Sequence, residues 1–373
     1  MRILLSGGGT AGHINPAIAI ADRIKKDHPD SVIAFVGTKN GMENRLVANA
    51  GYDMYHVEVR GLQRSLSPRN ILTAYYFLTA PRKADRLISE FEPDCVIGTG
   101  GYVCWPLLKA AAKRGIPCVL HEANAIPGKA VQMLEDKVDR IYINFENSKG
   151  RYKHPEKLMY TGNPLIDTGD RKLPGKAEAR RALGIPDGYR YVVLSSGGSL
   201  GATTLTSAVI GAMCELSSRD DIYFIHSTGK GHFVEAKKTF DRCALGKNFV
   251  LRDYIYDMPL WQAAADVIIS RSGSMSLSEI ARAAKPSILV PSPYVAENHQ
   301  FENAKALTEA GAAEVVEEKE LTASLLCGKL VSLLEDETRR RNMSEKLRGF
   351  SKDDAAEMIV RDIEKLINSK RPE

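Results

Sequence analysis

The sequence contains no apolar run long enough to cross a bilayer, and the short ILLS run after its first arginine is too brief for the core of a signal peptide. Its six cysteines form no C-x-x-C pair and belong to no Cys/His set at metal-ligand spacing. We therefore expect reduced thiols in the core of a protein of the cytoplasm. Low-complexity tracts and short repeats are also lacking.

The composition is that of an ordinary globular protein. Hydrophobic residues make up 44% of the chain and charged residues 26%, which excludes the disordered, collagen-like and disulfide-scaffold classes. A chain of 373 residues exceeds the usual size of one domain, so we expect about two domains, each with its own core.

Positive charge is unevenly distributed. Lys and Arg number 22 against 16 Asp and Glu up to residue 163, and 29 against 30 beyond it. The segment ILTAYYFLTA is flanked by six basic residues, namely Arg60, Arg64, Arg69, Arg82, Lys83 and Arg86. We predict that this basic segment binds an anionic membrane surface, although a solvated loop followed by an ordinary amphipathic helix gives the same pattern. No nucleic-acid-binding motif accompanies the charges, so we expect no nucleic acid partner.

Apolar strand-like runs alternate with helical periodicity, as in a parallel sheet covered by helices. In the first half the strand-like runs include RILLS, VIAFVG, DCVIGTGG and PCVLHE, and a helix is expected over PAIAIADRIKKD. The alternation restarts at YRYVVLSSGG, after YTGNPLID. We therefore predict an α/β protein with two Rossmann-like doubly wound domains, residues 1–163 and 164–345, and closing helices over 346–373 that pack back on the first domain.

Glycine-rich turns follow strands in both halves: GGGTAGH at 7–13, GTGGYV at 98–103 and SSGGSLGA at 195–202. Backbone N–H groups and the positive end of a helix dipole favour an anion at such turns. The first turn also fits the G-x-G-x-x-G pattern of dinucleotide sites, but those sites require an acid at the end of the second strand, which here ends in GTK at 37–39. The missing acid disfavours NAD, and the residues alone leave open whether His13 makes this a catalytic loop.

Two polar clusters in the second half suit a nucleotide and a sugar. Glu279 lies one to two turns into a helix expected to start near Ser274, where a carboxylate can bind ribose, although an acid near a helix start is often only a dipole complement. The segment PSPYVAENHQ ends in Glu297, Asn298, His299 and Gln300, which suit a hydroxyl-rich ligand. Capping of the next helix is the structural alternative.

These motifs, taken together and in order, resemble the MurG family, the N-acetylglucosaminyltransferases of peptidoglycan synthesis. The matching stretches are GGGTAGH, GTGGYV, HEAN with AIPG, GNP, GGS-x-GA, SRSG followed by Glu279, and PSPYVAENHQ, from residue 2 to about 310. The resemblance implies a GT-B fold, with two Rossmann-like domains facing a cleft. It also implies inverting transfer of N-acetylglucosamine from UDP-N-acetylglucosamine to undecaprenyl-pyrophosphoryl-N-acetylmuramyl-pentapeptide.

The same resemblance assigns site residues. His13 is the expected catalytic base. Donor-binding residues by resemblance are Thr10, Ala11, Gly12, Asn124, Ser199, Ile255, Ser274, Met275, Glu279 and Gln300. Acceptor-side candidates are Gly100, Gly101, Tyr102, His121 and Glu122. Within the donor set, Ile255 is expected to meet the uracil, Glu279 the ribose, the turn at Ser274 the diphosphate, and Gln300 the sugar.

Inverting transfer needs a base for the acceptor hydroxyl and stabilisation of the charge that grows on UDP. A neutral histidine can be the base near pH 7, and helix N-termini can stabilise the diphosphate. The chain has no D-x-D motif, so we expect no metal, and no cofactor is implied. The implied location is peripheral, at the cytoplasmic face of the cell membrane.

Five positions depart from the family pattern. Ala11 stands for a common glycine, Ala123 for a glutamine, and Lys285 for an apolar residue, while Leu165 and Ile166 follow GNP where relatives often have an arginine. Two other functions remain open. A UDP-N-acetylglucosamine 2-epimerase shares the fold and donor, and a non-catalytic UDP-sugar-binding protein would need Glu279 and Ser199 without His13. His13 could also be a helix-start residue bonded to its own backbone.

Overall fold

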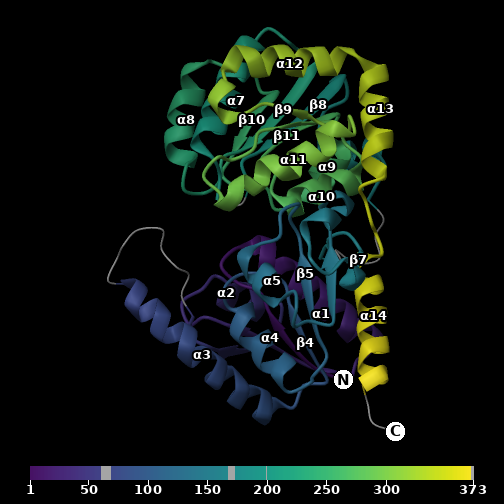
Figure 1. The fold of residues 1–373 in the computed structure, drawn as a ribbon. Helices are drawn as coiled ribbons and strands as arrows, with labels where there is room; N and C mark the ends of the chain where they lie inside the picture. Colours follow the sequence, from purple (N-terminus) through teal and green to yellow (C-terminus); the bar gives the residue numbers. More distant parts are fainter. Residues whose placement is uncertain (60–68, 167–172, 199, 371–373) are drawn as a thin grey trace. The chain divides into compact units, whose positions relative to one another are not determined.

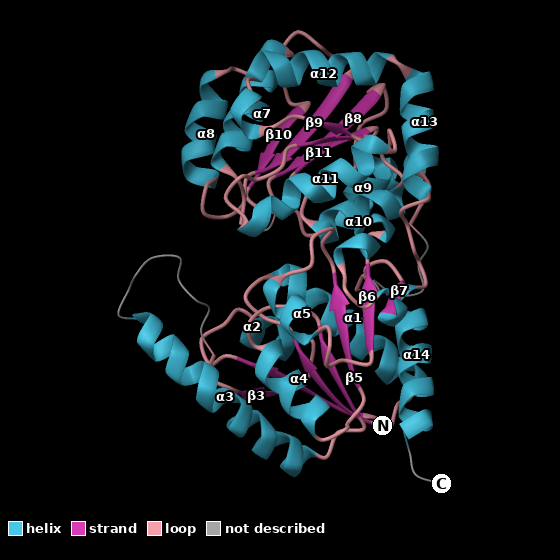
Figure 2. Cartoon of the chain, viewed as in Figure 1, coloured by secondary structure: helices cyan, strands magenta, loops and turns pink. Residues whose placement is uncertain are grey.

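The computed structural model describes residues 1–59, 69–166, 173–198 and 200–370 (Figure 1). The chain divides into two compact units: unit 1 comprises residues 1–168 and 352–373, and unit 2 comprises residues 169–351. Each unit is a parallel β-sheet flanked by helices, as Figure 2 shows. The predicted α/β class with two doubly wound domains is confirmed.

Unit 1 contains a seven-stranded parallel sheet of order β3-β2-β1-β4-β5-β6-β7. Its strands are β1 (Arg2–Ser6), β2 (Val32–Gly37), β3 (Asp53–His56), β4 (Cys95–Gly98), β5 (Cys118–Glu122), β6 (Arg140–Ile143) and β7 (Leu158–Tyr160). Successive side chains point to opposite faces, so Leu4 lies in one apolar core while Ile3 and Leu5 lie in the other. Continuous Val, Ile and Leu runs therefore suit this sheet, because both of its faces are covered.

Helices cover the two faces of the unit 1 sheet. They are α1 (Ala11–Asp27), α2 (Glu43–Asn49), α3 (Arg69–Phe91), α4 (Cys104–Lys113), α5 (Lys129–Leu134) and α14 (Ala355–Lys370). Helices α1 and α14 contribute to one core, and α3 and α4 to the other. The last helix is also held by polar contacts, since Asp362 accepts hydrogen bonds from Arg140 (3.0 Å) and Tyr142 (3.1 Å).

Helix α1 begins earlier than the sequence pattern indicated. The expected helix began at Pro16, because proline is favoured in a first helical turn, but α1 begins at Ala11 and contains Pro16 in its interior. A proline there forfeits one backbone hydrogen bond. The buried side chains of Ile14, Ile18 and Ile20 hold the helix against the sheet despite that loss.

Unit 2 contains a six-stranded parallel sheet of order β10-β9-β8-β11-β12-β13. Its strands are β8 (Tyr191–Ser196), β9 (Ile222–Ser227), β10 (Phe249–Arg252), β11 (Val267–Ser270), β12 (Ser287–Leu289) and β13 (Glu314–Val315). Its helices are α6 (Lys176–Ala182), α7 (Thr203–Glu215), α8 (Phe233–Arg242), α9 (Met258–Ala264), α10 (Ser274–Ala283), α11 (His299–Glu309), α12 (Ala323–Glu335) and α13 (Glu337–Arg348). The residues near the C-terminus divide between the units, because α13 belongs to unit 2 and α14 to unit 1.

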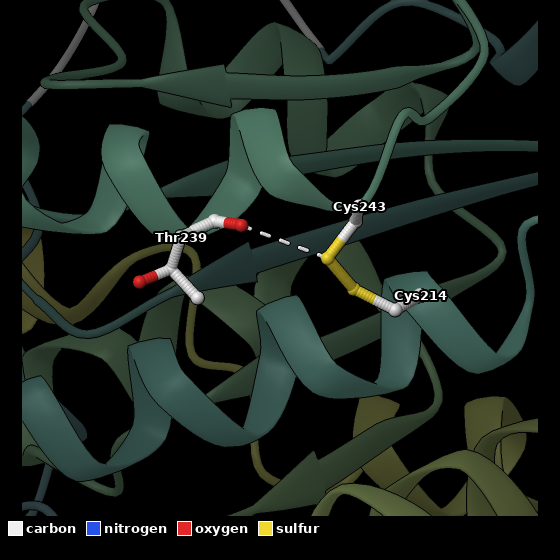
Figure 3. The surroundings of a disulfide bond; sticks show 3 residues. All are labelled: Cys214, Thr239 and Cys243. Carbon is white, nitrogen blue, oxygen red and sulfur yellow. Dashed lines mark hydrogen bonds between the residues drawn. A yellow bond between two sulfur atoms is a disulfide. The ribbon is translucent and has the colours of Figure 1, made fainter.

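Cys214 and Cys243 correct the expectation that all thiols are reduced. Their sulfurs form a disulfide between α7 and the residue that follows α8, with the two Cα atoms 5.6 Å apart (Figure 3). The sequence did not reveal this pair because 29 positions separate the cysteines and their contact depends on how α7 packs against α8. The other cysteines are free thiols, and burial raises the pKa of Cys104 to about 11.

Candidate functional site

Unit 1 has its topological switch point between β1 and β4, because the chain extends the sheet from β1 through β2 to β3 and then returns to the other side of β1. Ligands of open α/β sheets bind at such a point, beyond the carboxyl ends of the strands. The turns after β1 and β4 meet there, and Gly8 N donates to Gly100 O over 3.3 Å. A Cβ on Gly101 would lie 2.4 Å from Gly8 O, so this approach requires glycine.

The imidazole of His13 is held by the turn after β4. His13 Nδ1 lies 3.1 Å from the carbonyl oxygen of Thr99, and the Thr99 hydroxyl donates to the carbonyl oxygen of His13 over 2.6 Å. A Cβ on Gly100 would lie 2.4 Å from His13 Nδ1, so the ring packs on a glycine. Because a carbonyl only accepts, Nδ1 carries the proton, and the neutral ring has its lone pair on Nε2.

The first turn of α1 carries the other expected donor contacts of unit 1. Thr10 is exposed, Ala11 and Gly12 are half-buried, and the carbonyl of Thr10 accepts from His13 N (3.1 Å) and Ile14 N (3.2 Å). Ala11 lies in the helix with a negative φ, so the absence of glycine there causes no strain. On the neighbouring turn Tyr102 is 62% exposed, which leaves its ring accessible to a ligand.

Strand β5 ends in His121 and Glu122, and both side chains are buried. Burial lowers the pKa of His121 to about 4, so this imidazole is neutral at physiological pH. Burial also raises the pKa of Glu122, against the hydrogen bonds that it accepts from Gly128 N (2.8 Å) and Asn124 N (2.9 Å). The Glu122 carboxylate thereby fixes the loop that presents Asn124.

Unit 2 has its switch point between β8 and β11. The glycine turn after β8 packs closely on the loop after β9, since a Cβ on Gly201 would lie 1.9 Å from Thr228 O. Ser199 of this turn lies outside the described residues. After β11, Gly273 is the N-cap of α10, the helix that begins with buried Ser274 and half-buried Met275. The N-terminus of α10 therefore lies at the switch point, where its amides can meet an anion.

Glu279 lies in the second turn of α10 and is half-buried. Burial raises the pKa of its carboxyl group, while a 3.4 Å hydrogen bond donated by Gln262 acts against that rise. Ile255, expected at the uracil, is 6% exposed in the segment between β10 and α9, so its side chain is core and its backbone is the part that a base could meet.

Gln300 is oriented by the turns that follow β11 and β12. Its Oε1 accepts from Ser292 N over 2.9 Å, and its backbone oxygen accepts from the Ser272 hydroxyl over 2.8 Å. Just before it, Glu297 and Asn298 have φ values of 53° and 52°, in the left-handed region that non-glycine residues seldom occupy. Such strain is concentrated at functional sites, and here the loop presents the Gln300 side chain.

Several residues that organise these turns escaped the sequence analysis. Arg271 is buried, donates to the carbonyls of Val290 (3.1 Å) and Pro291 (3.2 Å), and forms an ion pair with Glu318. Lys285, noted only as a departure from an apolar position, donates to Ala263 O over 2.7 Å, and burial lowers its pKa to about 8. A charged residue beside a glycine turn was the available signal for Arg271, but its partners follow β12 and lie in the short helix at Glu318–Glu320, far along the chain.

Within the described part of the chain, no group of three or more His, Cys, Asp or Glu side chains is arranged to hold a metal ion. The described helices also include none that combines the length and apolar character needed to cross a membrane.

Comparisons with known proteins agree with this arrangement. The Glycosyltransferase family 28 N-terminal domain matches residues 3–143, and the Glycosyltransferase family 28 C-terminal domain matches residues 192–359. A UDP-N-acetylglucosamine--N-acetylmuramyl-(pentapeptide) pyrophosphoryl-undecaprenol N-acetylglucosamine transferase from Caldicellulosiruptor saccharolyticus is 39% identical over 371 residues, which cover 99% of this chain and 98% of the relative. The fold is thus that of a GT-B glycosyltransferase.

Solved structures narrow the class further. The crystal structure of MurG from Acinetobacter baumannii has a TM-score of 0.78 and 25% identity, and the match covers 98% of this chain and 99% of that one. The chain therefore belongs to the MurG family within glycosyltransferase family 28. A UDP-GlcNAc 2-epimerase from Neisseria meningitidis, bound to UDP-GlcNAc, has a TM-score of 0.68 over 98% of this chain and 100% of its own, but at 17% identity it shares the fold alone.

Proposed function

We propose that the protein transfers N-acetylglucosamine from UDP-N-acetylglucosamine to the lipid-linked N-acetylmuramyl-pentapeptide of peptidoglycan synthesis, with inversion at the sugar. The names of its relatives support the donor and the acceptor. The observation that carries the chemistry is the hydrogen bond from His13 Nδ1 to Thr99 O, because it puts the lone pair of the neutral ring on Nε2.

In the proposed reaction His13 Nε2 takes the proton from the acceptor hydroxyl as that oxygen attacks the anomeric carbon. The bond from the anomeric carbon to the UDP oxygen breaks, and the diphosphate takes the electron pair and the negative charge. Amides at the N-terminus of α10, which lies at the switch point of unit 2, stabilise that charge. Glu279 binds the ribose hydroxyls, and Gln300 uses its amide donors on the sugar, since its Oε1 already accepts from Ser292.

The remaining residues are also assigned either to the donor or to the acceptor. The backbone at Ile255 reads the uracil, Ser274 and Met275 lie at the diphosphate, and Thr10, Ala11, Gly12 and Asn124 contact the donor from unit 1. Gly100, Gly101 and Tyr102 meet the acceptor, while His121 and Glu122 support that surface from within the sheet, because both are buried. Ile166, which is 37% exposed, offers no charge to a phosphate and so does not provide the arginine contact that the family resemblance implies.

The deciding experiment combines labelled UDP-N-acetylglucosamine with a short-chain lipid acceptor and extracts the lipid product. Label in the lipid fraction supports the transferase. Release of UDP with epimerised sugar and no labelled lipid would instead establish the epimerase, and donor binding without turnover would establish a UDP-sugar-binding protein.

Peripheral attachment to the cytoplasmic face of the cell membrane is the second part of the proposal. In α3 the side chains of Arg82, Lys83 and Arg86 are exposed, whereas Ala84 and Ile88 are buried against the unit 1 core. The basic residues therefore form an outer face that an anionic surface can attract. Arg60 and Arg64 of the predicted basic segment lie outside the described residues.

A further inference from the structure

Unit 1 buries a carboxylate for which the reaction described above has no use. Glu43, the first residue of α2, is 1% exposed and lies beneath the glycine turn that leads to His13. Its carboxylate accepts hydrogen bonds from the Thr38 hydroxyl (2.7 Å), from Thr38 N (2.9 Å) and from Gly9 N (3.4 Å). No described basic side chain pairs with it, so hydrogen bonds alone compensate the buried charge.

Glycines make the space for this carboxylate. A Cβ on Gly41 would lie 2.0 Å from Glu43 Oε1, and a Cβ on Gly37 would lie 2.7 Å from Glu43 Cγ. From the side of the turn, a Cβ on Gly8 would come within 3.3 Å of Glu43 Cδ. Three segments of backbone therefore close around one side chain, which makes a built site rather than an incidental contact. Burial opposes ionisation, but the donated hydrogen bonds outweigh it and hold the pKa of Glu43 below its ordinary value.

The turn between β1 and α1 is thus held at successive points. Gly8 N donates to Gly100 O, Gly9 N donates to Glu43, and His13 Nδ1 donates to Thr99 O. Gly9 has a φ of 84°, and a Cβ on it would meet no atom within 4 Å, while its amide donates to Glu43. A carboxylate on a glycine-turn amide takes the place that an external anion takes in phosphate-binding turns.

We propose that Glu43 is a positioning residue for the transfer: an internal anion that fixes the turn from which His13 projects. The inference rests on the proposed role of His13. Because Gly9 N donates to Glu43, this amide is not available to a bound anion. A dinucleotide site would have an acid at the end of β2, and this chain has none there. Glu43, at the start of the following helix α2, instead accepts hydrogen bonds from the protein's own backbone.

The test compares Glu43→Ala and Glu43→Gln with the wild type. Alanine removes the acceptor atoms, and glutamine keeps one acceptor oxygen without the charge. We expect kcat to fall about 10- to 100-fold in Glu43→Ala, because small displacements of a catalytic base are costly, with a smaller loss in Glu43→Gln. Affinity for UDP, measured by calorimetry, should not change, since unit 2 supplies most donor contacts. Added formate should restore part of kcat in Glu43→Ala, whereas chloride at equal ionic strength should not.

The matched control is Asp362→Asn, which removes a carboxylate of unit 1 that bonds Arg140 and Tyr142 instead of the glycine turn. This variant should lose thermal stability and keep kcat. The proposal is overturned if folded Glu43→Gln and Glu43→Ala both keep kcat within about twofold of wild type, a loss too small for a displaced base. If Glu43→Ala does not fold, Glu43→Gln alone decides. A wild type without transfer activity would refute the proposed function instead, so the two failures are distinguishable.

Discussion

The two units share one topology and use it differently. In both, a glycine turn follows the first strand of the sheet and a second turn follows the strand across the switch point, β4 in unit 1 and β11 in unit 2. In unit 1 these turns contact each other, because Gly8 N donates to Gly100 O. They also hold the imidazole of His13, whose Nδ1 donates to Thr99 O. In unit 2 the second turn opens into α10, and a Cβ on Gly273 would meet no atom within 4 Å.

The difference between the two pairs of turns fits two requirements, a rigidly held base in unit 1 and an accessible anion site in unit 2. A base needs a fixed direction, so the unit 1 turns are crowded and their polar atoms are bonded to each other. A diphosphate needs room for its oxygens, and a Cβ on Gly273 at the start of α10 would meet no atom within 4 Å, while Ser272 donates to the backbone oxygen of Gln300. Variants in unit 1 should therefore act on turnover, and variants in unit 2 on donor affinity.

The largest effect should come from His13→Ala. Loss of the base should lower kcat about 100- to 10,000-fold, the usual contribution of a positioned general base. UDP affinity should remain near that of the wild type, because most proposed donor contacts belong to unit 2. Steady-state kinetics and calorimetry measure the two quantities separately.

A thermal melt is the control for His13→Ala, since a lost contact with Thr99 also affects the packing of the turn. A folded variant that keeps more than about a tenth of wild-type turnover would show that His13 is structural. The base would then have to be sought elsewhere, and the buried, neutral His121 is a poor substitute.

Glu279→Ala should produce the converse result in unit 2. Removing charged hydrogen bonds of about 1.5 to 3 kcal/mol should weaken UDP binding about 10- to 150-fold, while kcat at saturating donor changes less. Glu279→Gln is the matched variant, because it keeps the side chain's volume and an acceptor oxygen. Unchanged UDP affinity in a folded Glu279→Ala would contradict the assignment to ribose.

Much of this division could be predicted from sequence, because it depends on local patterns. Strand and glycine-turn order predicted both sheets, and the helix start at Ser274 follows from a glycine before Ser-rich residues. His13 was a candidate because an imidazole follows a glycine turn. The family was predicted from seven motifs in order, each of which is weak evidence alone, and the comparisons confirm it.

The contacts that orient these residues could not be predicted, because they join segments far apart in the chain. Thr99 contacts His13 across 86 positions, and Arg271 donates to Val290 and Pro291 in the loop that follows β12. Glu43 has the sequence pattern of an ordinary helix-start acid, and only the structure places it against Gly9. The Cys214–Cys243 pair was missed for the same reason. Local periodicity specifies elements, but side-chain partners depend on tertiary packing.

Acid should destabilise both units through one buried imidazole each. Burial lowers the pKa of His121 to about 4 and that of His226 to about 3, against an ordinary value of 6.5. Between the lowered pKa of each buried histidine and the ordinary value of 6.5, the unfolded chain binds a proton that the folded chain does not. The free energy of unfolding therefore falls as the pH falls below about 6.5. Each histidine contributes a slope of about 1.4 kcal/mol per pH unit in that window.

The two tryptophans allow each unit to be followed by itself, because Trp105 lies in unit 1 and Trp261 in unit 2. Trp261→Phe leaves a reporter for unit 1, and Trp105→Phe leaves one for unit 2. Urea unfolding from about pH 7 to about pH 5 should show a decreasing midpoint with both reporters. A midpoint independent of pH in one unit would refute the neutral buried histidine of that unit.

The smallest expected effect concerns the exposed basic face of α3, which has no proposed counterpart in unit 2. The variant Arg82→Ser, Lys83→Ser, Arg86→Ser removes three charges, each worth about 1 kcal/mol at most near an anionic surface and less once salt screens it. We expect sedimentation with acidic phospholipid vesicles to decrease several-fold at low salt, and the difference to shrink as salt rises.

The matched control changes Lys237, Lys238 and Arg242 to serine in α8, where they are also exposed. That control removes the same charge from unit 2 and should bind vesicles as the wild type does. Equal binding by the α3 variant would refute the membrane role of this face, and an equal decrease in both variants would show that net charge alone, and not α3, attracts the protein to the surface.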